Sequence, residues 1–301
     1  MKLSCFFDLD KVYRDSDFYA LGLSNSNPGV PFLTYIDNTK FLGEIQENKN
    51  VVAIICKREH LPLFVDKNIG IIIVDNPRKT YFQLHNILSN DKNYYNNLEN
   101  TIIGENCSIS KLASISYSGV KIGKNVIIED FVKIQGPCII GDNTVIHSGC
   151  VIGGSGYEFK RYSEDILDVI HCGSVEIGEN VIIWENVTIH KAVYPWDTTK
   201  IGSWCRVGAL THINHGAKIE ELVEVCARCT ISGRTYIGKH AFVGPGSIIS
   251  NRIHIGDNAK VLLGSVVTKD VEAEQVVSGN FAIEHDKHIS SVKADSLAVL
   301  R

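Results

Sequence analysis

Aliphatic side chains recur at every sixth position over the C-terminal two thirds of the chain. The longest uninterrupted series of β-branched residues runs in steps of six from Ile201 to Val267, and a second runs from Ile122 to Ile152. A third series, from Ile177 to Ile189, is in phase with the first. A period of six fits neither the 3.6-residue turn of an α-helix nor the alternation of an ordinary strand. The pattern therefore predicts short strands separated by regular turns.

Three six-residue sides make one 18-residue coil, in which the first position of each hexad points inward. The fifth position is mostly small or β-branched, as a narrow interior near a corner requires. We interpret five cysteines at this position as small core fillers: Cys107, Cys138, Cys150, Cys205 and Cys229. Successive coils should stack at roughly 4.8 Å, the spacing of paired strands, so that residues 18 apart lie one above the other.

Two breaks in the hexads predict loops that project from the coils. The first break spans Gly153 to Ser174, and the second spans Tyr194 to Lys200. In the second loop, Trp196 and Asp197 are candidate contacts to a substrate. The alternative is a surface loop without a functional role.

Residues 1–98 lack the hexads and carry apolar runs at 51–55 and 71–74, with a helix-like stretch after Asn76 and Pro77. This mixture predicts a small α/β domain. The hexads define a β-helix domain over residues 99–282, and a loose helical spacing of apolar residues predicts a short helix in the tail, 283–301. The predicted fold is therefore mainly β, a parallel β-helix of hexapeptide repeats between these two smaller parts.

Composition and charge exclude several classes of function. Thirty Lys and Arg against 34 Asp and Glu give a net charge of -4 without a long basic run, so we expect no nucleic-acid partner. No stretch of 18 apolar residues occurs, so we expect no membrane span and a cytoplasmic location. Nine cysteines, an odd number in a long chain, predict free thiols.

The segment Thr211–Gly216 gathers polar side chains at one point of the repeat, and His215 is its candidate general base. An imidazole titrates near neutral pH and can take the proton of an attacking amine. His212, three residues earlier, is a candidate second contact to the substrate. The alternative is that both histidines are ordinary surface residues of one β-helix face.

Metal chemistry has weaker support in the sequence. Cys226 and Cys229 form a C-x-x-C pair, but no second pair or suitably spaced histidine accompanies it, so we expect no metal site. A metal-dependent hydratase on the same scaffold would need three histidines to meet across a subunit boundary.

Hexads of the type Ile-Gly-x-x-x-x, in this number, resemble those of the left-handed β-helix acyltransferases. Over nearly the whole chain the sequence resembles the UDP-3-O-acylglucosamine N-acyltransferases of lipid A synthesis. The C-terminal half resembles bacterial nucleotide-sugar N-acetyltransferases about as well. The left hand of the coil is implied by the resemblance alone, because parallel crossovers are generally right-handed. The resemblance also implies a homotrimer with active sites between adjacent subunits.

The resemblance implies catalytic roles for two residues. Ile213-Asn214-His215 is similar to the catalytic histidine motif of these families. Gly233 lies 18 residues beyond His215, one coil below it, and matches a glycine whose N–H stabilises the thioester oxyanion. A routine turn glycine is the alternative. The loop Gly153–Phe159, which contains Tyr157, resembles a loop that lies near the substrate.

The segment Leu33–Phe41 resembles the uridine-binding segment of the lipid A enzymes. The resemblance implies that Tyr35 and Phe41 stack on a pyrimidine and that Asn38 reads its edge by hydrogen bonds. The alternative is that both aromatic side chains belong to the core of a small domain.

The last coils resemble those of CoA-dependent hexapeptide transferases. Their closing signature is Gly264–Val271 followed by Ser278–Ala282, in which Lys269 would meet a phosphate of CoA. The edge with Ser250 and Asn251 would lay out the pantetheine arm along backbone groups. This ending departs from that of the lipid A enzymes, so acyl-CoA is the preferred donor and an acyl carrier protein the alternative donor.

Together these patterns predict an N-acyltransferase that moves an acyl group from acyl-CoA to the amine of a UDP- or dTDP-linked amino sugar of a surface-glycan or lipopolysaccharide pathway. The alternative is an acyl carrier protein-dependent UDP-3-O-acylglucosamine N-acyltransferase of lipid A synthesis. An O-acyltransferase, a metal-dependent hydratase and a non-catalytic binding helix are weaker hypotheses.

Overall fold

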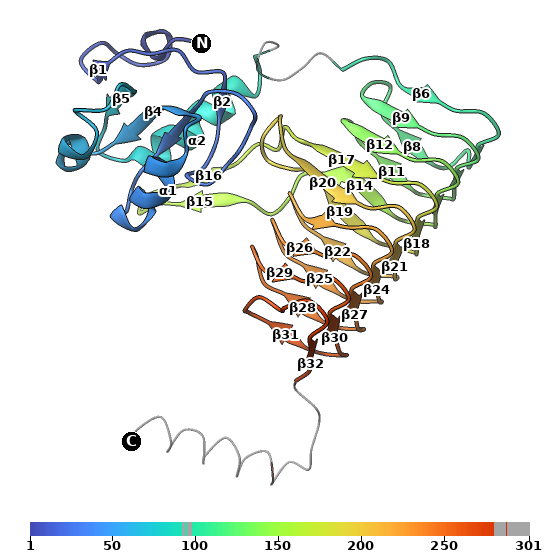
Figure 1. Cartoon of the computed structure of the whole chain (residues 1–301). Helices are drawn as coiled ribbons and strands as arrows, with labels where there is room; N and C mark the ends of the chain where they lie inside the picture. Colours follow the sequence, from blue (N-terminus) through green and yellow to red (C-terminus); the bar gives the residue numbers. More distant parts are fainter. Residues whose placement is uncertain (92–93, 95–97, 280–286, 288–301) are drawn as a thin grey trace.

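The computed structural model describes residues 1–91, 94, 98–279 and 287. Residues 1–91, here called the N-terminal unit, lie beside the first half of a long β-helix (Figure 1). The β-helix then continues beyond this unit to its last described coil.

The N-terminal unit is built on a five-stranded sheet with the strand order β1-β5-β4-β3-β2, in which only β1 runs antiparallel to its neighbour. The apolar runs of the sequence form β4 and β5, two of its three inner strands, because a strand covered on both faces is apolar throughout. The strands are β1 (Val12–Arg14), β2 (Ala20–Leu21), β3 (Phe32–Tyr35), β4 (Val51–Cys56) and β5 (Gly70–Ile73). The helices are η1 (Leu3–Cys5), η2 (Thr39–Phe41), α1 (Leu42–Glu47), η3 (Arg58–Leu63) and α2 (Pro77–Leu88).

Helix α2 begins where the sequence predicts a helix. The side chain of Asn76 accepts a hydrogen bond from the Lys79 N–H, and Pro77 occupies the first helical position, where its missing N–H costs nothing. The buried face of α2 includes Tyr81 and His85, which point towards the β-helix. This helix therefore contributes to the contact between the two parts.

The β-helix has three parallel sheets, one for each side of the coil. The first sheet contains β6 (Ile102–Ile103), β9 (Val120–Ile122), β12 (Cys138–Ile140), β17 (Ser174–Ile177), β20 (Thr198–Ile201), β23 (Lys218–Ile219), β26 (Tyr236–Ile237) and β29 (His254–Ile255). The second contains β7 (Ser108–Ile109), β10 (Ile127–Ile128), β13 (Val145–Ile146), β18 (Ile182–Ile183), β21 (Arg206–Val207), β24 (Glu224–Val225), β27 (Phe242–Val243), β30 (Lys260–Val261) and β32 (Val276–Val277). The third contains β8 (Ser114–Ile115), β11 (Lys133–Ile134), β14 (Val151–Gly154), β19 (Thr188–His190), β22 (His212–Ile213), β25 (Thr230–Ile231), β28 (Ile248–Ile249) and β31 (Val266–Val267).

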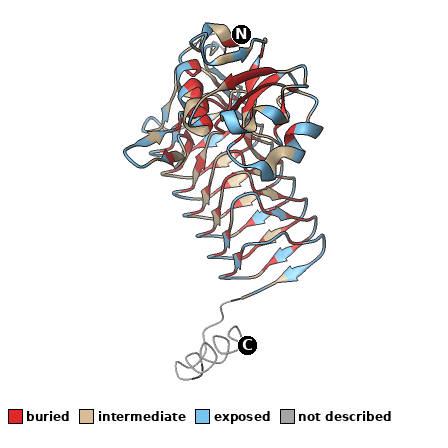
Figure 2. Cartoon of the chain, turned by 90° about the vertical axis from the view of Figure 1, so that its left-hand side faces the viewer, coloured by how far each residue is buried: buried red, intermediate tan, exposed pale blue. Residues whose placement is uncertain are grey.

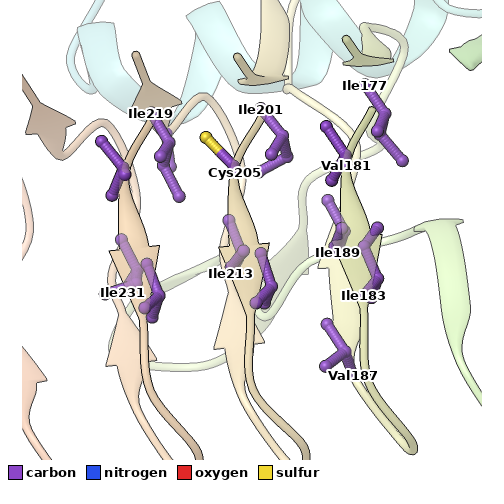
Figure 3. Close-up of a cluster of buried hydrophobic side chains, with 14 of the residues drawn as sticks. Ile177, Val181, Ile183, Val187, Ile189, Ile201, Cys205, Ile213, Ile219 and Ile231 are labelled. Atoms are coloured by element: carbon purple, nitrogen blue, oxygen red, sulfur yellow. The ribbon is translucent and has the colours of Figure 1, made fainter. Parts of the chain in front are cut away.

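The predicted inward positions form the core of the β-helix. Every residue of the series from Ile201 to Val267 is buried, and so are the fifth-position cysteines from Cys138 to Cys229. Figure 3 shows these aliphatic side chains stacked in columns inside the coil, and Figure 2 shows burial following its inner side. Full burial of one such side chain stabilises the fold by about 1.5–3 kcal/mol.

The corners of the coil use the left-handed backbone region, which asparagine tolerates better than most residues. Asn125, Asn143 and Asn180 have φ of 57°, 57° and 58°. Arginines occupy some corners of later coils, among them Arg234 and Arg252, with φ of 59° and 63°. Corner side chains point away from the core, so they are available for other contacts.

Both predicted breaks in the repeat form insertions that hold the N-terminal unit. The first contains a hairpin of β15 (Phe159–Arg161) and β16 (Ile166–Asp168), and the side chain of Asn86 on α2 donates to the Asp168 carbonyl at 2.7 Å. In the second, the Tyr194 hydroxyl meets the Tyr81 hydroxyl at 3.1 Å. Sequence-distant insertions therefore position the N-terminal unit against the coils.

The predicted architecture is confirmed: a left-handed parallel β-helix with a small N-terminal α/β part. The predicted helix at 283–301 lies, except for Lys287, outside the described residues, as do the last three residues of the closing signature. Among the helices that the structure describes, none combines the length and the apolar character needed to cross a bilayer.

Candidate active site

His215 follows strand β22 at the third position of its hexad, where side chains point out of the coil. The Asn214 side chain accepts a hydrogen bond from the His215 N–H at 2.8 Å, which fixes the backbone at this point. The adjacent Gly216 N–H donates to the Thr199 hydroxyl at 2.8 Å. A rigid coil therefore carries the candidate base, as precise placement of a catalytic group requires.

Gly233 lies directly below the imidazole of His215, as the 18-residue coil predicts. The Arg234 N–H, next in the chain, donates to the His215 carbonyl at 3.0 Å. A Cβ atom on Gly233 would come within 2.8 Å of Cε1 and Nε2 of His215, so only glycine leaves the ring in place. Among the described residues the Gly233 N–H has no hydrogen-bond acceptor, so it can donate to a bound group.

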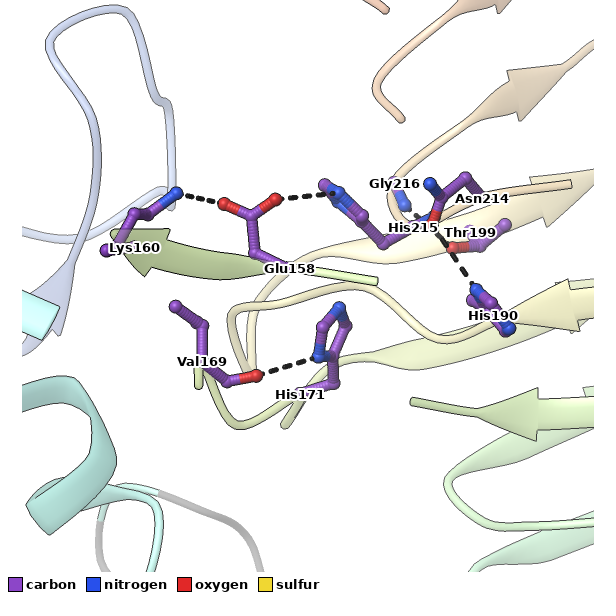
Figure 4. Close-up of polar contacts among 9 residues, drawn as sticks. All are labelled: Glu158, Lys160, Val169, His171, His190, Thr199, Asn214, His215 and Gly216. Carbon is purple, nitrogen blue, oxygen red and sulfur yellow. Dashed lines mark hydrogen bonds and ion pairs between the residues drawn. The ribbon is translucent and has the colours of Figure 1, made fainter. Parts of the chain in front are cut away.

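A carboxylate that sequence reasoning missed reaches His215 from the first insertion. Glu158 Oε2 lies 3.5 Å from Nε2 of His215, and its other oxygen pairs with the Lys160 ammonium (Figure 4). Burial alone would raise the pKa of Glu158, but hydrogen bonds from His215 and Lys160 lower it to about 2. Burial lowers the pKa of Lys160, which lies 4.4 Å above the Phe82 ring. Glu158 is thus a permanent negative charge beside the candidate base.

A further histidine, His171, lies beside His215, with ring centroids 5.5 Å apart. The Nδ1–H of His171 donates to the Val169 carbonyl at 3.1 Å, while its buried Nε2 has no partner among the described residues (Figure 4). Burial, together with the charge of His215, lowers the pKa of His171 to about 4. A Cβ atom on Gly156 would lie 2.8 Å from His171 Nε2, so glycine lets the Glu158 loop approach this closely. We interpret His171 as a neutral wall of the site.

His215 and Gly233 open into a cavity of about 470 Å³ between the N-terminal unit and the β-helix. Glu158 and Tyr157 line it from the first insertion, as the loop resemblance predicts for Tyr157. Asn251 lines its lower end. The cavity therefore brings one predicted donor contact, Asn251, and two predicted substrate contacts, Tyr157 and Tyr35, to the candidate base.

The predicted pyrimidine-binding residues also come together. Tyr35, Asn38 and Phe41 line a second cavity, of about 310 Å³, at the end of strand β3. Arg78 and Arg252 line both cavities, so the two form one continuous groove. Burial raises the pKa of the Tyr35 hydroxyl, which keeps this side chain uncharged.

Three predicted substrate contacts lie outside both cavities. Trp196 stacks on Tyr194 with ring centroids 5.5 Å apart, and its indole N–H donates to the Leu21 carbonyl at 2.8 Å, so it joins the second insertion to the N-terminal unit. Asp197 pairs with Lys218 at 2.9 Å. His212 meets the Thr188 hydroxyl at 2.7 Å. None of the three side chains lines the groove, so their predicted contacts to the substrate stay predictions.

Two predicted donor contacts lie away from His215. Ser250 does not line the groove, although its neighbour Asn251 does. Lys269 lines a separate cavity of about 280 Å³ at the last coils. Within the described ranges, no group of three or more His, Cys, Asp or Glu side chains forms a metal-binding cluster.

The comparisons with known proteins agree with this geometry. Residues 119–154 match the family model described as bacterial transferase hexapeptide (six repeats). Residues 100–129 and 234–269 match the hexapeptide repeat of succinyl-transferase. A UDP-3-O-acylglucosamine N-acyltransferase of Helicobacter pylori (strain ATCC 700392 / 26695) is 28% identical over 279 residues, which cover 81% of this chain and 78% of that protein.

The chain carries transferase hexapeptide repeats, and its enzyme class is that of an acyltransferase. A second relative of the same name, from Rickettsia prowazekii (strain Madrid E), is 37% identical to this acyltransferase over 113 residues, 38% of this chain and 32% of that protein. A UDP-N-acetylglucosamine acyltransferase from Campylobacter jejuni shares its fold, with a TM-score of 0.54 at 21% identity, over 65% of this chain and 79% of that chain. The predicted enzyme class is confirmed.

Proposed function

We propose that this acyltransferase transfers an acyl group from a carrier thioester to the amine of a nucleotide-linked amino sugar, with UDP-3-O-acylglucosamine as the acceptor. The observation that carries the proposal is the continuous groove from Tyr35, Asn38 and Phe41 to His215. One end offers aromatic faces and an amide to a base, and the other offers a general base to an amine. The names of the relatives support this acceptor over other amino sugars.

In the proposed reaction, the amine nitrogen attacks the thioester carbonyl carbon, and His215 takes the amine proton. The N–C bond forms and the C–S bond breaks, and the thiolate leaves with a proton returned by His215. The unpaired N–H of Gly233 donates to the carbonyl oxygen as its negative charge grows. Glu158, 3.5 Å from Nε2, stabilises the positive charge that develops on His215.

The donor is a thioester on either CoA or an acyl carrier protein. The names of the relatives favour the acceptor of the alternative stated above, UDP-3-O-acylglucosamine, for which the family resemblance implies an acyl carrier protein as the donor. One observation favours CoA, since Lys269 lines a cavity at the last coils beside Ser265. An acyl-CoA-dependent transfer to another nucleotide-linked amino sugar is therefore the second candidate.

We also propose a homotrimer in which neighbouring coils complete each site. Large apolar side chains on the corners support it: Trp204 and Leu222, on successive coils, are 53% and 44% exposed. Apolar groups of this size in contact with water commonly mark an interface. Sedimentation velocity of the full chain tests this directly, and a monomer at micromolar concentration would contradict it.

The decisive experiment is a thiol-release assay with UDP-3-O-acylglucosamine, using acyl-CoA and acyl carrier protein thioesters in parallel. His215→Ala should lower turnover by about 10²- to 10⁴-fold, the usual contribution of a general base, and leave the fold intact. The product should carry the new acyl group on nitrogen, as mass spectrometry and hydroxylamine resistance can show. Wild-type turnover in His215→Ala, or transfer to a hydroxyl group, would contradict the proposal.

A further inference from the structure

Three arginine side chains meet where the two cavities join. Arg78 lies in the first turn of α2, and Arg234 and Arg252 occupy one corner of the β-helix on successive coils. All three line the cavity of His215, and two of them, Arg78 and Arg252, also line the cavity of Tyr35. The N-terminal unit and the β-helix therefore both contribute positive charge to the same place.

None of these three guanidinium groups has an ion pair or a hydrogen bond to another residue that the structure describes. By contrast, the guanidinium groups of Arg14 and Arg206 donate to backbone carbonyls. Arg234 lies 5.7 Å from the ring centroid of Tyr194, a contact that supplies no negative charge. Three fork-shaped donors are thus left without acceptors around one groove.

The groove contains too little negative charge to balance them. The His215 cavity is lined by four cationic side chains, the three arginines and Lys160, against the single carboxylate of Glu158, a surplus of three positive charges. The Tyr35 cavity adds one carboxylate, Asp37, and one cation, Lys40, so the surplus of the groove stays at three. Both oxygens of Glu158 already face Lys160 and His215. Arg78 and Arg234 add to the effect of burial in lowering the pKa of Lys160, as like charges at close range must. An arrangement of this kind favours an anionic ligand.

The backbone does not call for arginine at these corners. Arg234 and Arg252 have φ of 59° and 63°, a region in which asparagine and glycine are less strained. Most corners of the earlier coils have asparagine instead. An arginine at these corners therefore adds a side-chain charge and gives the turn no advantage.

We infer that Arg78, Arg234 and Arg252 form a binding site for the diphosphate of the nucleotide sugar. Guanidinium groups match phosphate oxygens in paired, charge-assisted hydrogen bonds. A diphosphate at this junction places the base beside Tyr35 and Phe41 and the sugar beside His215, which fixes the direction of the substrate in the groove. The inference rests on the proposed function, and it names the subsite that joins its two ends. CoA also contains a diphosphate, so the test must separate the two sources.

The test is isothermal titration calorimetry on the full-length protein with UDP, UMP, uridine and CoA as probes. The variants are Arg78→Gln, Arg234→Gln and Arg252→Gln. Arg228→Gln is the matched control, because Arg228 is an exposed corner arginine with φ of 58° that lies outside the groove. Thermal unfolding without ligand checks the fold, and removal of an unbalanced charge should leave the midpoint unchanged or higher.

The wild-type protein should bind UDP more tightly than UMP, and UMP more tightly than uridine. Each groove variant should weaken UDP binding by about 10- to 100-fold, the value of one charge-assisted hydrogen-bond pair, and leave uridine binding unchanged. Arg228→Gln should bind all four probes like the wild type.

Equal affinity of the wild-type protein for UDP and uridine would overturn the inference. So would arginine variants that lose CoA binding but keep UDP binding. The second result would assign the arginines to the donor. Failure to bind any nucleotide would also overturn it, while acyl transfer to a phosphate-free amino sugar would show that the catalytic part of the proposed function still holds.

Discussion

Glu158 offers the sharpest test of the chemistry, because its carboxylate faces His215 and can be removed without a change of shape. The change is Glu158→Gln. At 3.5 Å, a carboxylate and an imidazolium attract each other by about 5 kcal/mol at an effective dielectric constant of 20. Partial exposure and the competing charge of Lys160 reduce this value, and a hydrogen bond to a charged group is worth about 1.5–3 kcal/mol. We therefore expect kcat to fall by about 10- to 100-fold.

The assay is thiol release at saturating donor and acceptor, with kcat and KM determined separately. KM should change little, since the lost attraction acts on the charge that His215 gains during the reaction. The pKa of Glu158 lies at about 2, so the carboxylate is charged throughout the pH range of the assay. The ratio of wild-type to variant kcat should accordingly stay constant above about pH 5.

The β-helix supplies a matched control in a second glutamate–histidine pair, Glu129 and His147, whose atoms lie 3.0 Å apart outside the groove. Glu129→Gln should keep the wild-type kcat. Lys160→Met removes the ammonium group that pairs with Glu158. This variant tests whether Glu158 acts only by anchoring the hairpin through that pair. A kcat for Glu158→Gln within twofold of the wild type, or an equal loss in Glu129→Gln, would refute the role of the charge.

Gly233→Ala would place a methyl group 2.8 Å from Nε2 of His215 and displace the imidazole, so kcat should fall by about 10- to 100-fold, whereas Gly43→Ala, with open space around it, should have no effect on turnover. His171 should make folding stability depend on pH, because its folded pKa of about 4 lies below the ordinary 6.5. The contribution of His171 to the free energy of unfolding is complete above pH 6.5. As the pH falls towards 4, the free energy of unfolding decreases by about 3 kcal/mol in total, because the unfolded chain takes up the proton first. Urea unfolding at several pH values should show this slope in the wild type and a smaller one in His171→Asn; the ionisable groups that face His171 are His215, Glu158 and His190. Trp196→Phe removes one hydrogen bond to Leu21 and should cost about 1 kcal/mol in urea unfolding, with kcat/KM unchanged; a large loss of kcat/KM would instead restore Trp196 to the substrate site.

The β-helix could be predicted from the sequence because each coil repeats the same local requirement. Ile201, Val207 and Ile213 fill equivalent inward positions on the three sides of one coil, and all are buried. The same 18-residue spacing predicts Gly233 below His215, and the structure has it there. The left-handedness of the coil is implied by family resemblance alone, since the spacing of residues does not determine handedness.

The parts that could not be predicted depend on contacts between distant segments. Glu158 follows a glycine-rich loop that the sequence marks as an insertion, but its distance from His215 is set by how the hairpin packs on α2. The position of Arg78 depends on the same packing. Trp196 looked like a pocket residue because it precedes the coil of His215, and the structure uses it to hold the N-terminal unit. A sequence pattern does not report the docking of one domain on another.

The β15–β16 hairpin links two parts of the groove. Its first end carries Glu158 to His215, the candidate base, and its second end holds α2, the helix that supplies Arg78 to the groove. A shorter or longer hairpin would alter the catalytic charge and the acceptor pocket at once. The two properties must therefore change together in evolution, and a hairpin grafted onto another β-helix would lose its function unless a matching α2 accompanied it.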